Sequence, residues 1–153
     1  MSLYNFKHSK ILRRRVKKML VVIIQCDDTT KRCSGFFCMN DFYNRDGAFK
    51  DYPEDTQYMT MTCGGCCATL LNAKLANLKL RITKGNFQKS DIIFHLASCI
   101  CSDSSHHQPC PFINRIKNII LRKGFSEEQI KLGSHISKTA EARRKAGEYK
   151  SWN

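Results

Sequence analysis

Three short apolar runs, separated by segments with helical periodicity, restrict this chain to an α/β fold. The runs are rich in Val, Ile and Met, and they read "MLVVIIQC", "QYMTMTC" and "DIIFHLASC". Continuous apolar runs of this kind are typical of parallel strands that are buried on both faces. A fourth, shorter strand is predicted at "QIKLGSH".

The segments between these strands carry helical signals. Four apolar residues recur at spacings of four, three and four, and they are Leu71, Leu75, Leu78 and Ile82. Gly85 can end this helix, and a second helix is predicted between Pro111, which opens it, and Gly124, which ends it. A helix anchored by aromatic residues is predicted from about Ser34 to Arg45, and a last, polar helix from about Lys138 to Glu148.

Strands that alternate with helices form parallel βαβ units with right-handed crossovers. We therefore predict an α/β three-layer sandwich around a small, mostly parallel sheet of about four strands in the order 2-1-3-4, as in Rossmann and flavodoxin-like folds. With 153 residues, the chain is predicted to form one main domain that spans residues 19–149. Residues 150–153 are expected to be a short tail.

The net charge of +13 is concentrated at the start of the chain. Seven of the 26 basic residues lie between Lys7 and Lys18, and no acidic residue precedes Asp27. We predict that residues 1–18 form a disordered basic extension, which could bind RNA or anionic lipid. Nucleic acid is not an expected partner of the remaining chain, which carries 19 basic and 13 acidic residues.

The sequence predicts a cytoplasmic protein without a membrane segment. The apolar run near the start, Met19 to Ile24, is too short for a signal-peptide core or for a bilayer span. Nine cysteines do not form a complete disulfide framework, because their number is odd. In a reducing compartment, clustered cysteines more often bind metal or carry out thiol chemistry than form structural disulfides.

Most of the cysteines follow the carboxyl ends of the predicted strands. In an open parallel sheet these positions meet in one crevice, which is the usual ligand site of the architecture. The residues concerned are Cys26, Cys63, Cys66, Cys67, Cys99, Cys101, Cys110 and His135. Cys33 could reach the same crevice from the start of the next helix, whereas Cys38 is more typical of a core residue.

The segment "TCGGCC" places Cys63 and Cys66 two residues apart, a spacing that suits one metal ion or one disulfide. The glycines between them let backbone N–H groups turn toward sulfur. A helix that follows the motif would stabilise thiolate over thiol at its N-terminus. The other cysteines of the crevice favour metal binding, because a redox pair needs only one resolving partner.

The strand that ends in Cys26 and the later segments "RDGAF", "TCGGC", "HLASC" and "CPF" resemble the CGGC domain family, small Cys- and His-rich proteins common in anaerobic bacteria and archaea. The resemblance runs from about Val21 to His135. Proline commonly follows the CGGC motif in that family, and Cys67 stands there instead. The resemblance implies metal binding, with zinc as the expected ion, and it brings no known reaction.

We predict a zinc site whose first four ligands are Cys63, Cys66, Cys99 and Cys110. An iron–sulfur cluster would use the same thiolates. Further candidates at this edge are Cys26, Cys33, Cys67, Cys101, His95 and His135. His95 is also well explained as a hydrogen-bonded core histidine, and the loop residues His106 and His107 could approach as ligands.

Two enzyme interpretations stay open. A thiol–disulfide oxidoreductase would use Cys63 and Cys66 as its attacking and resolving thiols. The spacing Cys26-x5-Arg32 resembles the phosphate loop of low-molecular-weight tyrosine phosphatases and arsenate reductases. Asp27 and Asp28 oppose this second interpretation, because they would place negative charge inside an anion-binding loop.

Overall fold

The computed structural model describes residues 18–102 and 108–149. The predicted basic extension, apart from Lys18, and the predicted tail at 150–153 lie outside the described residues, as do His106 and His107. The proposed extent of the domain therefore stays a prediction at both ends.

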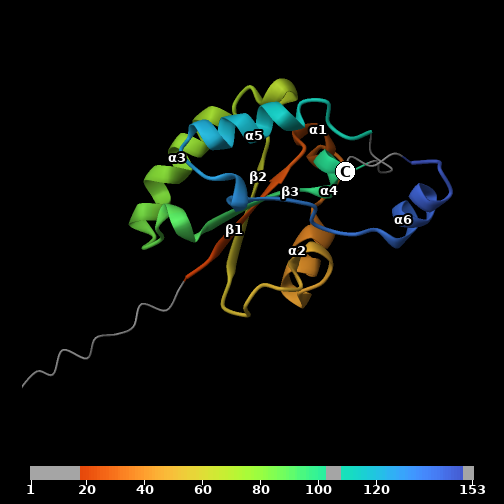
Figure 1. Ribbon diagram of the computed structural model, residues 1–153, viewed down its shortest axis with the longest axis horizontal. Helices are drawn as coiled ribbons and strands as arrows, with labels where there is room; N and C mark the ends of the chain where they lie inside the picture. The colour runs from red at the N-terminus through yellow and green to blue at the C-terminus, as the bar shows by residue number, and fades with distance from the viewer. Residues whose placement is uncertain (1–17, 103–107, 150–153) are drawn as a thin grey trace, which may run out of the picture.

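The centre of the molecule is a four-stranded parallel sheet in the order β2-β1-β3-β4 (Figure 1). This arrangement confirms the predicted α/β class and strand order. The strands are β1 (Leu20–Gln25), β2 (Gln57–Thr62), β3 (Ile92–Leu96) and β4 (Ile130–Leu132). β4 is shorter than its sequence run because Gly133, at φ 97°, turns the chain out of the sheet.

Burial along the strands follows their position in the sheet. β1 and β3 lie inside the sheet and are largely buried, as their continuous apolar runs predict. β2 is an edge strand, in which Met59 and Met61 pack against the larger core, while the partly exposed Tyr58 contacts the Phe42 ring with centroids 4.6 Å apart. The alternating pattern of "QYMTMT" is therefore that of a strand with one apolar face and one more polar, partly exposed face.

Helices cover both faces of the sheet (Figure 1). α3 (Leu71–Lys84) and α5 (Ile113–Arg122) lie together on one face, and α2 (Phe36–Asn44) lies on the other. The predicted apolar stripe of α3 is buried as expected. α5 begins two residues after Pro111, and α6 (Lys138–Lys145) ends earlier than predicted.

The aromatic residues of α2 differ from the prediction. Of its four, only Phe42 is buried, while Phe36, Phe37 and Tyr43 are exposed. α2 follows Gly35 and ends at Arg45, and both of these residues have left-handed backbone angles. The helix is thus short, and one aromatic ring anchors it to the sheet.

Short helical turns join the longer elements. Two of them, α1 (Asp27–Thr30) and α4 (Ser98–Cys101), directly follow β1 and β3, and the sequence patterns did not predict them. The remaining turns are η1 (Gly47–Phe49), η2 (Cys66–Ala68), η3 (Lys89–Asp91) and η4 (Glu127–Gln129). In the described part of the chain, no helix has the length and apolar character needed to cross a membrane.

The "RDGAF" segment fixes the loop after α2. The Arg45 guanidinium donates to the backbone carbonyls of Tyr52, Pro53 and Glu54 at 3.1, 2.8 and 3.0 Å. Gly47 has φ 57°, and a Cβ there would lie 2.9 Å from the Ser134 carbonyl oxygen. Only glycine fits this close approach. The segment therefore holds the α2 side of the molecule against the chain that follows β4.

The core consists of two clusters, one on each face of the sheet. Alternate residues of β1 point to opposite faces, so Val22 and Ile24 join the larger cluster and Val21 and Ile23 the smaller one. α3 and α5 fill the larger cluster with Leu and Ile. Phe42 and other side chains of the opposite layer complete the smaller one.

Candidate functional site

Strand ends bring several of the predicted cysteines to the same edge of the sheet. Cys26 follows β1, Cys63 follows β2, and Cys99 lies in α4 directly after β3. All nine cysteines lie in the described part of the chain, and none of them forms a disulfide there. The edge thus carries a group of reduced thiols.

Two of these sulfurs accept hydrogen bonds from the turn after β1. The Cys26 N–H donates to Cys99 Sγ at 3.2 Å, and the Asp27 N–H donates to Cys63 Sγ at 3.5 Å. Such bonds favour the thiolate form, but burial opposes them. Burial raises the pKa of the Cys99 thiol to about 12, and it also raises the pKa of Cys63. Both side chains therefore favour the neutral thiol in this structure.

The CGGC loop has an unusual backbone. Gly64 and Gly65 have φ values of 82° and 96°, and a Cβ on Gly64 would lie 2.9 Å from the Leu71 nitrogen. Cys67 and Ala68 are also left-handed, at φ 64° and 54°, although neither is glycine. Left-handed non-glycine residues cost free energy and often occur at functional sites. The loop is therefore held in a strained shape that places Cys63 inside and Cys66 at the surface.

The motif does not stand at the N-terminus of a long helix, as the sequence suggested. Its second cysteine, Cys66, begins the short turn η2, and α3 begins only at Leu71. The N–H group that reaches the Cys63 sulfur comes instead from Asp27, on the neighbouring strand connection. This stabilising contact was missed because it joins segments that are 36 residues apart.

A chain of hydrogen bonds between polar side chains holds the start of the CGGC loop in place. Lys74 Nζ donates to Thr62 Oγ1 at 2.6 Å, and the Thr62 hydroxyl donates to Asp27 Oδ1 at 2.8 Å. These contacts tie α3, the end of β2 and the start of α1 together. They fix the two strand ends that carry Cys26 and Cys63.

Cys110 approaches the same side of the edge. Its N–H donates to the Ile100 carbonyl at 2.8 Å, which brings the "CPF" segment toward α4. Burial raises the pKa of the Cys110 thiol, and the nearby thiols of Cys63, Cys26 and Cys66 would raise it further if ionised. These neighbours together with Cys110 form what we call the CGGC cluster: Cys26, Cys63, Cys66 and Cys110.

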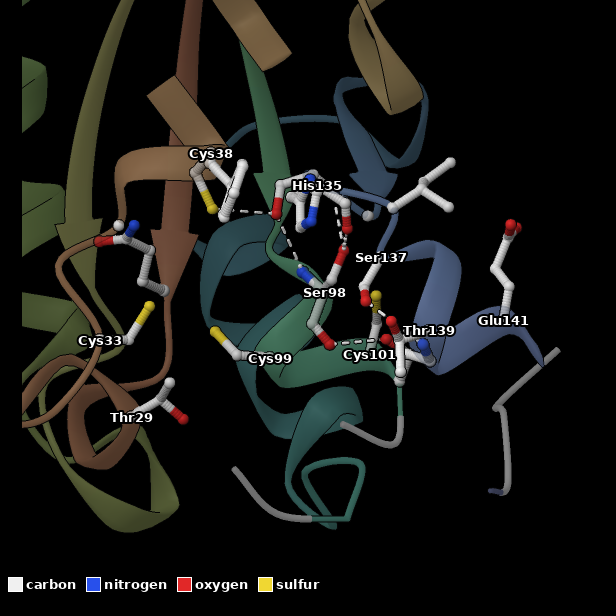
Figure 2. Close-up of a pocket in the computed structure, with 18 of the residues that line it drawn as sticks. Thr29, Cys33, Cys38, Ser98, Cys99, Cys101, His135, Ser137, Thr139 and Glu141 are labelled. Carbon is white, nitrogen blue, oxygen red and sulfur yellow. Dashed lines mark hydrogen bonds between the residues drawn. The ribbon is translucent and has the colours of Figure 1, made fainter. Parts of the chain in front are cut away.

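Other cysteines line a cavity of about 640 Å³ beside the ends of the strands (Figure 2). The thiols of Cys33, Cys38 and Cys99 lie around this cavity (Figure 2). Cys38, expected to be a core residue, also contacts the Ser134 hydroxyl at 3.3 Å. Cys101 borders the cavity as well, but it is buried and its S–H donates to the Leu96 carbonyl at 3.6 Å.

His135 reaches the same cavity and is held in place from two sides. Its Nδ1–H donates to Asp41 Oδ2 at 2.7 Å, and its ring stacks on Phe37 with centroids 4.6 Å apart. Because Nδ1 carries the hydrogen, Nε2 of the neutral ring is the acceptor nitrogen. Asp41 is buried and was not identified from the sequence, since it lies 94 residues from its partner.

His95 lies away from the cysteines and inside the fold. Its Nδ1–H donates to the Gly133 carbonyl at 2.8 Å, and its Nε2 accepts from the Tyr52 hydroxyl at 2.7 Å. Burial lowers the pKa of His95 and keeps the ring neutral. With both nitrogens bonded, His95 has the contacts of a core histidine.

The chemistry of the thiols fits a soft metal ion, but their positions do not form a ready site. Across residues 18–102 and 108–149, no three His, Cys, Asp or Glu residues are placed to hold one metal ion. Cys99, one of the four predicted ligands, faces the cavity with Cys33 and Cys38 (Figure 2). Cys67 is half-buried beside Cys66, in the strained part of the loop.

The segment between Cys26 and Arg32 does not resemble a phosphate cradle. Asp27–Thr30 forms the helical turn α1, and Arg32 Nη1 donates to Asp28 Oδ2 at 3.2 Å. The Asp27 carboxylate already accepts from Thr62. Two carboxylates thus occupy the loop, which does not support the phosphatase or arsenate reductase interpretation.

The sequence was compared with curated proteins, solved structures and protein-family models. Searches of curated proteins and of solved structures find no match to this chain. A family model does match, and it covers all four strands and the cysteines described above. The chain therefore belongs to the CGGC domain family, whose model spans residues 20–135.

Proposed function

We propose that this CGGC domain binds a soft metal ion, zinc first, through the thiolates of Cys63, Cys66 and Cys110, with Cys26 or Cys99 as the fourth ligand. The main support for this proposal is that Cys26 and Cys63, at the ends of β1 and β2, lie beside the same turn. In this turn the Asp27 N–H donates to the Cys63 sulfur. N–H bonds of this kind also orient and stabilise metal-bound thiolates.

The CGGC loop would have to move for the metal to bind, because the thiols are not gathered around one point. Two adjacent glycines give the loop conformational freedom, and the left-handed Cys67 and Ala68 make its present shape costly. A bound cation would also favour the thiolate form of Cys110, against the burial that raises its pKa. Zinc would supply Lewis-acid or structural chemistry according to whether a ligand position stays open.

Protein purified without oxygen and exposed to zinc tests this proposal. We expect about one zinc per chain, as a single four-coordinate site requires. Cys66→Ser and Cys110→Ser should each lose most of the metal, while the matched control Cys38→Ser, at the cavity, should keep it. Comparing Cys26→Ser with Cys99→Ser identifies the fourth ligand. Metal-free protein under these conditions would overturn the proposal, and iron with a brown colour would assign a cluster instead.

A thiol–disulfide oxidoreductase is the second candidate, and one observation favours it: Cys66 is exposed while Cys63, two residues away, is buried. Cys66 thiolate would attack a substrate disulfide, forming a mixed disulfide and releasing one substrate thiol. Cys63 would then attack the Cys66 sulfur, release the second thiol and leave the protein oxidised. Cys63→Ser should trap the mixed disulfide, detected by mass spectrometry, and Cys66→Ser should form none. Equal loss of metal from both variants, with no trapped adduct, would exclude this candidate.

A further inference from the structure

The face of the sheet that α3 and α5 cover has an unusual charge composition. From residue 57 to 90 and from 108 to 126, the segments that contain α3 and α5 have basic residues and no acidic ones. We call these bases the basic layer: Lys74, Lys79, Arg81, Lys84, Lys89, Arg115, Lys117, Arg122 and Lys123. The segment 27–55, which contains α2 on the opposite face, has seven acidic and four basic residues.

The basic layer is accessible and is not neutralised within the described structure. None of its nine bases is buried. Among residues 18–102 and 108–149, the ion pairs all lie elsewhere. The nearest acidic residues in the sequence, Asp91, Glu127 and Glu128, lie in the turns η3 and η4. The net charge of this face is therefore strongly positive.

The two helices hold these charges on one continuous surface. α3 and α5 lie together over the same face of the sheet (Figure 1), and Lys79 Nζ donates to the Lys123 carbonyl at 2.9 Å. The apolar stripes of both helices are turned inward, which leaves their polar sides facing outward. Positive side chains from both helices thus form one surface.

We propose that the basic layer binds nucleic acid by contacts to the phosphate backbone. Clustered Lys and Arg attract phosphates without reading base sequence, and they release counterions on binding. A membrane surface fits less well, because lipid-binding helices also insert large apolar side chains. Among the described residues of this layer, Leu70 and Leu80 are the large apolar side chains that are exposed. Lys74 bonds to Thr62 beside the CGGC loop, and none of the cysteines belongs to the basic layer.

The test compares two four-residue variants of the full chain, so that the basic extension is present in both. The layer variant carries Arg81→Gln, Lys84→Gln, Arg115→Gln and Arg122→Gln. The control variant carries Lys31→Gln, Lys50→Gln, Lys131→Gln and Lys138→Gln, which are exposed residues away from the basic layer. Both variants lose the same charge, and the lost side chains are at the surface, so melting curves should overlay those of the native chain.

Affinity for a labelled 20-base-pair DNA duplex is measured by fluorescence anisotropy over a series of salt concentrations. We expect the layer variant to bind at least about tenfold more weakly than the native chain, with a salt slope smaller by up to about 3.6, because each of the four lost phosphate contacts removes about 0.9. The control variant should stay within about threefold. Equal weakening of both variants would overturn the proposal. The proposal would also be overturned if the layer variant alone lost binding to anionic vesicles and kept its affinity for the duplex.

Discussion

The two faces of the sheet use the same central strand in different ways. On the face covered by α3 and α5, Val22 and Ile24 of β1 contact a large cluster of Leu and Ile side chains. On the face covered by α2, Val21 and Ile23 belong to a smaller cluster that includes Phe42 and Phe49. Buried polar groups, Asp41 and His95, also lie on this second face, together with the cavity lined by thiols.

This difference indicates that the two faces of the sheet are packed to different extents. Long helices with regular apolar stripes fill space completely, and buried apolar area is the main source of stability. A short helix that contributes one buried ring cannot cover its side of the sheet, so polar side chains and a cavity occupy the remaining space. The α3 and α5 face should therefore dominate the free energy of unfolding, and the α2 face should tolerate more change.

The largest effect is expected for Leu75→Ala in α3. Leu75 is fully buried, and truncation of a buried leucine costs about 2–5 kcal/mol, depending on how far the surroundings relax. Urea denaturation measures the loss. Leu80→Ala in the same helix is the matched control, because Leu80 is 69% exposed and its truncation should cost less than about 0.5 kcal/mol. Equal losses would show that the α3 core is not well packed.

A direct comparison of the faces uses two neighbouring valines. Val21 and Val22 are both fully buried in β1 but point to opposite clusters. Val22→Ala should cost about 2–3 kcal/mol, because it removes apolar groups and leaves a cavity in the larger cluster. Val21→Ala should cost about 1–2 kcal/mol, since the smaller cluster can relax toward adjacent space. The reverse order in denaturation curves would contradict the proposed division between the faces.

On the α2 face, the bond between Tyr52 and His95 should contribute to stability. Tyr52→Phe removes the hydroxyl and leaves the buried His95 Nε2 without this donor, which should cost about 1–2 kcal/mol. Thermal unfolding measures the change. Tyr43→Phe serves as the control, because Tyr43 is 80% exposed. If both variants have the melting temperature of the native chain, the hydrogen bond between Tyr52 and His95 does not contribute to stability.

The smallest effect is a pH dependence that His95 contributes. Burial lowers the pKa of folded His95 below its ordinary value of 6.5, so below that pH the unfolded chain binds a proton that the folded chain does not. Stability should be constant above about pH 6.5 and should fall by at most about 1.4 kcal/mol per pH unit as the solution is made more acidic.

Denaturation at a series of pH values checks this expectation. The loss should flatten in His95→Gln, which cannot take up the proton. A variant that retains the full loss would show that His95 is not the source of the pH dependence.

Local patterns in the sequence determined the main elements and their order. The apolar runs predicted the strands, and the spacing of Leu71, Leu75, Leu78 and Ile82 predicted the buried stripe of α3. These patterns succeed because a buried strand or helix must place apolar residues at its own period, whatever its partners. The family membership also followed from short motifs in a fixed order.

Other features depend on contacts between distant segments, and only the tertiary structure decided them. The sequence grouped the cysteines at one edge, but the chain divides them between the CGGC cluster and the thiol-lined cavity. Their division depends on loop backbone angles, such as those of Gly64 and Cys67, which no periodicity encodes. The pairing of His135 with Asp41 could not be predicted for the same reason.

The placement of the basic residues on the surface also depends on the tertiary structure. Summed along the sequence, the residues after the basic extension carry a modest excess of basic over acidic groups. The sequence alone gives the positions of these basic residues along the chain. They lie on one surface because α3 and α5 pack on the same face of the sheet. A sequence determines which segments carry charge, whereas the fold decides which of those segments become neighbours, because right-handed crossovers and strand order place each helix on its face.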